Sequence, residues 1–220
     1  MDRKLLILSS LFFLLVVSSG CSSVYFATVE KFGYHKRDLL QSRVSSARQS
    51  QKEAKEEFKS ALEQFSSIVY FDGGDIADKY ATLSASFEQS ENKANEVRDR
   101  IDSVENVAEA LFDEWEDEIG QYSNANLRRT STATLTRTRA RYRPMIEAMR
   151  RAEESMNPVL DSFRDQVLFL KHNLNARAIA SLKDEVQSVE SNISQLLQEM
   201  DVAIKESEKF TRTLESNNNE

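Results

Sequence analysis

Among the residues whose side chains can bind ligands or do chemistry, arginine is the type most strongly clustered in one stretch of this chain. The run comprises Arg128, Arg129, Arg137, Arg139, Arg141, Arg143, Arg150 and Arg151. No acidic residue lies between Glu118 and Glu147. Grouped guanidinium groups attract phosphates and carboxylates, so one interpretation is a surface for an anionic polymer or a lipid phosphate.

A structural interpretation competes with that binding surface. Five acids precede a turn expected near Asn124: Asp113, Glu114, Glu116, Asp117 and Glu118. A hairpin at that turn brings these acids beside Arg128 and Arg137, so we favour internal charge pairing for the first part of the run. The later arginines lie farther from these acids and remain the candidate anion-binding or partner-binding residues: Arg139, Arg141, Arg143, Arg150 and Arg151.

Cys21 is the only cysteine, which excludes an internal disulfide and a multi-thiolate metal site. It follows a basic start and an apolar run over residues 5–17. That run is short for a membrane span and is typical of a signal peptide. Ser18-Ser19-Gly20-Cys21 resembles the lipobox of bacterial lipoproteins, with Ser18 where Leu is usual. We therefore expect Cys21 to be lipidated; the alternative is an uncleaved anchor helix extending to Ala27.

Lipidation at Cys21 implies an envelope location. In enterobacterial lipoproteins, Asp after the cysteine retains the protein in the inner membrane, and here that residue is Ser22. We expect a lipid anchor on the periplasmic face of the outer membrane, with inner-membrane anchoring as the alternative. The anchored cysteine makes the membrane the first expected partner, because each buried methylene of an acyl chain contributes about 0.8 kcal/mol.

Motifs for catalysis, metals and cofactors do not stand out. His35 and His172 lie outside any Glu-x-x-His pair, the hallmark of carboxylate-bridged metal sites in helical bundles. No Gly-x-Ser-x-Gly elbow is present, and Gly73-Gly74 lacks the Lys-Ser or Lys-Thr of a phosphate loop. We expect no catalytic residue, no metal and no cofactor. With a formal net charge of -7, nucleic acid is a poor partner.

Composition predicts long helices, since the chain has only 5 Gly and 2 Pro. From Leu40, apolar residues recur at helical steps that only Gln51 interrupts: Leu40, Val44, Ala47, Ala54, Phe58, Ala61, Phe65 and Ile68. Residues 72–75 predict a tight reversal. A second helix is expected over residues 76–122, with a heptad stripe of Tyr80, Leu83, Phe87, Ala94, Val97, Ile101, Val104, Ala108, Leu111, Trp115 and Tyr122.

The second half of the chain predicts two more helices. Residues 127–170 keep a seven-residue series and indicate a kinked helix, in which Pro144 and Pro158 each either start a segment or kink one. Residues 172–175 predict a reversal with Asn175 as the cap of a final helix, although a continuous helix through them is an alternative. The fold class is therefore all-α, an elongated antiparallel bundle of about four long helices with coiled-coil-like heptad packing.

Charge supports this pairing, because its sign alternates along the chain. Lys+Arg against Asp+Glu is 8 to 6 over residues 21–69, 4 to 15 over 70–125, 10 to 5 over 126–175 and 5 to 9 over 176–220. The expected organisation is a lipoprotein signal peptide over residues 1–20, a lipidated N-terminus and tether over 21–35, a helical bundle domain over 36–215 and a frayed tail over 216–220.

Several segments together resemble the DUF2959 family of gammaproteobacterial lipoproteins. Beside the lipobox they are Lys36-Arg37-Asp38-Leu39-Leu40, Phe71-Asp72-Gly73-Gly74-Asp75, Leu111-Phe112-Asp113-Glu114-Trp115, Pro158-Val159-Leu160 and Leu168-Phe169-Leu170-Lys171-His172-Asn173-Leu174-Asn175-Ala176. The last is the most specific. The resemblance implies an envelope lipoprotein and carries no catalytic residue over to this chain.

Two classes of function follow from the residues. The first is a non-enzymatic, lipid-anchored structural or interaction rod with an envelope protein as its partner. The second is a binding module for an anionic envelope polymer or lipid phosphate, acting through the arginine-rich face of the third helix. An enzyme ranks below both. Long amphipathic helices also pair further, so the pattern leaves oligomerisation open.

Overall fold

The computed structural model describes residues 36–70, 76–173 and 175–216. The predicted signal peptide, the tether with Cys21 and residues 217–220 of the tail lie outside these described residues, as does the Gly73-Gly74 reversal. Residues from Leu40 onward form one compact unit, and residues up to Leu39 belong to another.

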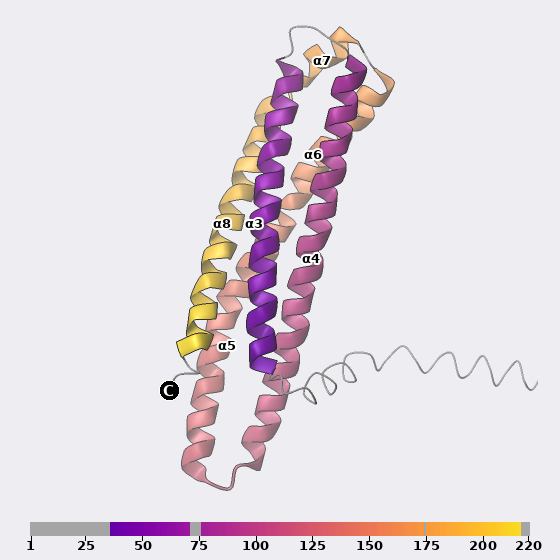
Figure 1. Cartoon of the computed structure of the whole chain (residues 1–220). Helices are drawn as coiled ribbons and strands as arrows, with labels where there is room; N and C mark the ends of the chain where they lie inside the picture. Colours follow the sequence, from indigo (N-terminus) through magenta and orange to yellow (C-terminus); the bar gives the residue numbers. More distant parts are fainter. Residues whose placement is uncertain (1–35, 71–75, 174, 217–220) are drawn as a thin grey trace, which may run out of the picture. The chain divides into compact units, whose positions relative to one another are not determined.

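Every secondary-structure element among the described residues is an α-helix (Figure 1). In chain order they are α3 (Lys36–Val69), α4 (Ile76–Gln121), α5 (Ala125–Glu154), α6 (Met156–His172), α7 (Ala176–Leu182) and α8 (Val186–Ser216). From Leu40 onward they pack as an antiparallel bundle, which confirms the predicted fold class.

The antiparallel arrangement is visible in which residues face each other. Between α3 and α8, Gln41 Nε2 donates to Glu215 Oε1 at 3.0 Å and Lys55 Nζ donates to Asp201 Oδ1 at 2.5 Å. Residue numbers thus rise along α3 as they fall along α8. The other neighbour of α3 is α4, which it meets through the Ser86–Gln64 hydrogen bond and the Lys93–Glu53 ion pair at 2.8 Å.

The α5–α6 pair forms the remaining side of the bundle, against α4 and α8. It meets α4 through Arg164 and Glu91, whose charged groups are 3.3 Å apart, and meets α8 through Arg151 and Glu199, 3.6 Å apart. Most ion pairs of α4 with α5 and α6 set an acid of α4 against an arginine. This agrees with the charge alternation predicted from the sequence.

The predicted apolar stripes form the core. All eight apolar residues predicted for the first helix are buried, as are Val189, Leu196, Ala203 and Phe210 of α8. Phe65 of α3 reaches across to Phe163 of α6, with ring centroids 6.1 Å apart. Burying each large apolar side chain contributes about 1.5–3 kcal/mol. Gln51 lies in the same core and is 0% exposed.

The third helix breaks at Ser155, three residues before Pro158, so Pro158 lies at the start of a segment, as one of the predicted alternatives has it. Pro144 lies inside α5 and does not end it. Ser155 Oγ donates to the Ala152 carbonyl at 2.9 Å, which satisfies a helix-terminal acceptor. Pro158 is tolerated because it lies in the first turn of α6, where backbone N–H groups have no intrahelical acceptor.

The reversal into the last helix is confirmed, and the helix is then interrupted once. Asn175 caps α7, because its Oδ1 accepts from the Ala178 N–H at 3.0 Å. A second break at residues 183–185 separates α7 from α8. There the N–H groups of Lys183 and Glu185 bond to carbonyls three residues back, at 3.3 and 3.1 Å, so the turn is tighter than α-helix.

Candidate functional site

A two-helix projection is the most prominent feature of the Leu40–Glu220 unit. Near its end, α8 contacts α5 through Thr213, whose hydroxyl accepts from Arg141 Nη1 at 2.7 Å. From Arg141 back to its start at Ala125, α5 continues for about 24 Å at 1.5 Å per residue. Figure 1 shows α4 and α5 running on together past the end of α8. Residues 112–138 are named the projecting hairpin below.

Local chemistry holds the projecting hairpin together. Asn124 is the N-cap of α5, because its Oδ1 accepts from the N–H groups of Asn126 and Leu127 at 2.9 and 3.2 Å. The indole Nε1 of Trp115 donates to Ser131 Oγ at 2.8 Å and links the two helices. Trp115 was predicted as core and is only partly buried, since no third helix covers this level.

Three aromatic rings close the bundle where the hairpin begins. Tyr142 of α5 lies between Phe112 of α4 and Phe210 of α8, with ring centroids 5.4 and 5.9 Å away. Burial raises the pKa of the Tyr142 phenol above its ordinary value, and the nearby Glu105 carboxylate adds to the shift. Tyr142 is therefore neutral at physiological pH and acts as a packing residue.

Arg150 is the centre of the densest ion-pair network. Its guanidinium bonds to Asp102 at 2.6 Å, to Glu105 and, within its own helix, to Glu153 at 2.6 Å. The Glu105 hydrogen bond, followed by those to Asp102 and Glu153, raises the pKa of Arg150 further above its ordinary value. A guanidinium so fully engaged joins α5 to α4 and offers little to an external anion.

The other predicted binding arginines are distributed around the molecule and do not form one surface. Arg139 bonds to Glu116 and lies 5.2 Å from the centroid of the Phe112 ring. Arg151 faces Glu199 of α8. Arg143 is exposed. Three of the five predicted arginines are therefore paired with carboxylates, counting Arg150.

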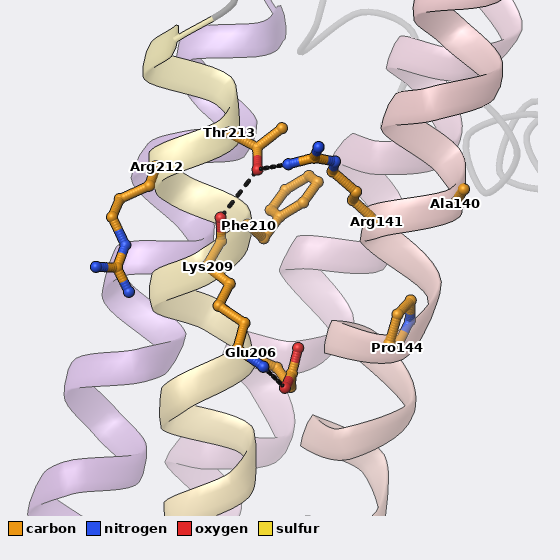
Figure 2. Close-up of a pocket in the computed structure, with 8 residues that line it drawn as sticks. All are labelled: Ala140, Arg141, Pro144, Glu206, Lys209, Phe210, Arg212 and Thr213. Atoms are coloured by element: carbon orange, nitrogen blue, oxygen red, sulfur yellow. Dashed lines mark hydrogen bonds and ion pairs between the residues drawn. The ribbon is translucent and has the colours of Figure 1, made fainter.

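Arg141 borders an open groove of about 520 Å³ between α5 and α8 (Figure 2). Its guanidinium reaches across toward Thr213, above the ring of Phe210. In the same wall, Lys209 pairs with Glu206, and Arg212 donates to the backbone carbonyl of Glu208 at 3.3 Å. Two arginines therefore line the groove, with Arg141 bonding to a hydroxyl and Arg212 to a backbone carbonyl.

The structure corrects the charge pairing favoured for the start of the arginine run. Among the described residues, no ion pair joins Arg128, Arg129 or Arg137 to an acid. Their guanidinium groups bond instead to Tyr122 O at 2.8 Å, Asn126 Oδ1 at 3.3 Å and Thr134 Oγ1 at 3.4 Å. Of the acids at the end of α4, Glu116 bonds to an arginine, and that arginine is Arg139.

The end of the projecting hairpin carries exposed apolar groups beside these arginines. Residues 121–130 are all exposed, and Leu127 and Tyr122 are 55% and 37% exposed. Tyr122 was predicted as core; this is wrong, because it lies beyond the level that α8 covers. Residues 122–129 are named the hairpin tip below. The sequence carries no clear signal for this tip, because heptad spacing predicts Tyr122 in the core and the nearby acids predict an ion pair for Arg128.

Two further properties bear on the kind of site. Within the described residues, no group of three or more His, Cys, Asp or Glu is placed to hold a metal ion. None of the helices described has the length and apolar character needed to cross a bilayer.

Fold and surface together define an all-α antiparallel helical-bundle protein with a projecting hairpin. The family model described as a protein of unknown function, DUF2959, matches residues 25–214, so the chain belongs to the DUF2959 family. The match covers nearly all of the described helices and confirms the resemblance noted in the sequence. Neither the curated proteins nor the solved structures contain a match to this chain.

Proposed function

We propose that this chain is a lipid-anchored envelope protein that works as a stiff, non-enzymatic structural or protein-interaction rod. One observation carries the proposal: a continuous set of contacts ties α4 to α5 and α6 along their length. It runs from Trp115 and Ser131 in the hairpin, through Arg150, to Arg164 and Glu91 near the other end. Such a set of ties opposes bending between the two helices.

The charged side chains support the same interpretation. In a binding module or an enzyme, charged groups are kept available for a ligand. Here the guanidinium groups of Arg139, Arg150 and Arg151 are used between helices. This use favours a protein whose first requirement is a fixed arrangement of its own helices.

The envelope location rests on the sequence around Cys21 and on the resemblance to lipoproteins. The order of basic residues, apolar run and Cys21 supports lipidation, and Ser22 supports the periplasmic face of the outer membrane. Mass spectrometry of the mature protein tests this. An N-terminal acylated Cys21 is expected, and an unmodified chain beginning at Met1 would contradict it.

The interaction role is tested by crosslinking in intact envelopes, followed by purification and identification of what is bound. One dominant envelope protein is expected. Recovery of the crosslinked partner is then compared between two variants. Arg143→Ala alters an exposed residue of α5, and Glu190→Ala alters an exposed residue of α8. Recovery of polymer fragments alone, released by high salt, would contradict the proposal and favour anion binding.

Anion binding along the third helix is the alternative, and its geometric support is weaker. It requires Arg139, Arg141, Arg143, Arg150 and Arg151 to act together. Three of these are in ion pairs, and Arg141 faces the groove beside α8. An anionic ligand would have to displace bonds that hold the bundle together.

A further inference from the structure

We propose that the hairpin tip rests on the anionic phospholipid surface to which Cys21 is anchored. The side chains involved are Tyr122, Leu127, Arg128 and Arg129. The proposal rests on the lipid anchor of the proposed function and adds a second membrane contact to it. It therefore gives the bundle an orientation, which a single point of attachment does not provide.

The position of the tip is the first argument. The chain enters the compact unit at Leu40, and the next residue, Gln41, bonds to Glu215 near the end of α8. Arg141 and Thr213 place α5 at this same end, and the hairpin continues beyond it by about 24 Å. The segment between Cys21 and Leu40 extends to about 65 Å at most. The compact unit therefore begins at the end of the bundle that carries the hairpin tip.

The direction of the side chains is the second argument. Helix side chains lean toward the N-terminus of their own helix. For α5 that direction is toward the tip, and Arg128 indeed reaches back to the carbonyl of Tyr122. For α4 it is away from the tip, so the carboxylates of Asp117 and Glu118 lean toward the bundle. Arginine charge is thus presented outward and acidic charge is held back.

The pairing of charge with apolar surface is the third argument. Leu127 is 55% exposed and Tyr122 is 37% exposed. Leu127 directly precedes Arg128 on α5, and the Arg128 guanidinium donates to the backbone carbonyl of Tyr122. Arginine and tyrosine with an exposed leucine fit the boundary between phosphate groups and acyl chains. There the polar ends meet headgroups and the apolar parts leave water.

A lipid surface fits this tip better than a protein does. A stable protein interface covers roughly 800 Å² on each partner, far more than four side chains at a hairpin end provide. A membrane needs no shape complementarity, and the anchor holds it at high effective concentration. Weak contacts at the tip are sufficient under those conditions.

Depth measurements on the lipidated mature protein test the proposal. Cys21 is the only native cysteine and is occupied by the lipid, so single labelling sites can be introduced. A fluorophore at Asn126→Cys reports on the tip, and one at Gln187→Cys, exposed near the start of α8, is the matched control. The protein is inserted into phosphatidylcholine vesicles containing phosphatidylglycerol and a headgroup-region spin-labelled lipid as quencher.

The tip label is expected to be quenched severalfold more than the control label, and high salt is expected to reduce the difference. Replacing Arg128 and Arg129 by Gln should lower the equilibrium constant for contact between the hairpin tip and the membrane surface by about 25-fold. Each arginine near an anionic surface contributes about fivefold to that constant. Arg137→Gln, two helical turns farther from the tip, should change it little.

Equal quenching at the two labels would overturn the proposal while leaving the anchor intact, provided that the protein floats with the vesicles. The same quenching in the Arg128→Gln, Arg129→Gln variant as in the native sequence would also overturn it. A protein that fails to float with the vesicles contradicts the lipid anchor itself, and both proposals then fail together.

Discussion

The helices α4 and α5 run through both the four-helix part of the bundle and the projecting hairpin, yet the two regions are stabilised differently. Beside α3 and α8, the core positions of α4 and α5 are closed to solvent; Ile101 and Met149 are each 0% exposed. In the hairpin the buried apolar residues are reduced to Phe112 at its base and Leu135, with a half-buried Trp115. Polar contacts stabilise the hairpin instead: the Asn124 cap, the hydrogen bond from the Trp115 indole and the Arg139–Glu116 pair.

This difference teaches how one heptad pattern serves two purposes. Where a third and a fourth helix are present, apolar burial supplies most of the stability and single polar contacts matter little. Where only two helices remain, each polar contact is a larger share of a small total. The hairpin is therefore expected to open locally before the rest of the bundle unfolds.

The largest effect is expected from the core of the four-helix part. Phe163→Ala removes a ring that is 1% exposed and packs against Phe65 across the bundle. Loss of burial and the remaining cavity should lower the free energy of unfolding by about 3–5 kcal/mol. Denaturant titration measures this, with Leu168→Ala on the exposed side of α6 as the control. A change below that of the control would contradict the comparison.

A smaller effect is expected from the ion-pair network between α4 and α5. Arg150→Met leaves Asp102 and Glu105 without their shared partner and should lower the free energy of unfolding by about 1–2 kcal/mol, discounted for partial exposure. Arg143→Met, at an exposed position on the same helix, should change it by a few tenths. A double-mutant cycle with Glu105→Gln isolates the pair, and additivity within error would sink this assignment.

Loss of the hairpin cap should have a more local effect. Asn124→Ala removes the acceptor for the N–H groups of Asn126 and Leu127 and should cost about 1 kcal/mol of helix stability. Hydrogen exchange of the amides in residues 126–131 should accelerate, while amides of α8 keep their rates. Equal acceleration in both places would show that the hairpin and the bundle unfold as one unit.

The smallest effect is expected from acid titration. Hydrogen bonds from Arg139 and Lys93 hold the pKa of the Glu116 and Glu53 carboxyls below their ordinary value of 4.5. Depressed values mean that these pairs stabilise the fold above about pH 4.5 and lose that contribution as the pH falls further. Both carboxyls are exposed, so the change is small. In the Glu116→Gln variant, hydrogen exchange of the hairpin amides should depend less on pH in the acid range, while that of the other helices should not change. An unchanged pH dependence in the hairpin would contradict a role for the Arg139–Glu116 pair.

Helix positions were predictable because burial follows periodicity. The helix expected over residues 76–122 is α4, Ile76–Gln121, and its end was marked by the polar residues around the Asn124 cap. The interruption at Ser155 had a signal in Pro158, whereas the one at residues 183–185 escaped prediction. Leu182, Val186 and Val189 keep helical steps through the tight turn, so the apolar pattern does not register it.

The arginine partners were not predictable at the same level. Sequence distance from the turn placed the acids before Asn124 beside Arg128, whereas the register pairs Glu116 with Arg139. Ion pairs depend on side-chain direction and on which neighbour faces a given turn, and neither is encoded in spacing along one helix. The projection itself had a signal in the length of α4, which has 46 residues against 34 in α3 and 31 in α8. A helix longer than the neighbours it packs against extends past them.

The buried amide of Gln51 has a consequence for how the helices find their alignment. A seven-residue repeat has a built-in ambiguity, since sliding a helix by one repeat still sets apolar groups against apolar groups. If α3 slid by one repeat, Gln51 would take the place of Val44 or Phe58, which are as fully enclosed as it is. Among the residues that the structure describes, both polar atoms of the Gln51 amide already lack a hydrogen-bond partner in the observed register, so the slide changes the volume in each layer and not the number of buried amides. The difference in side-chain volume between Gln51, Val44 and Phe58 therefore distinguishes these three levels of an otherwise repetitive pattern.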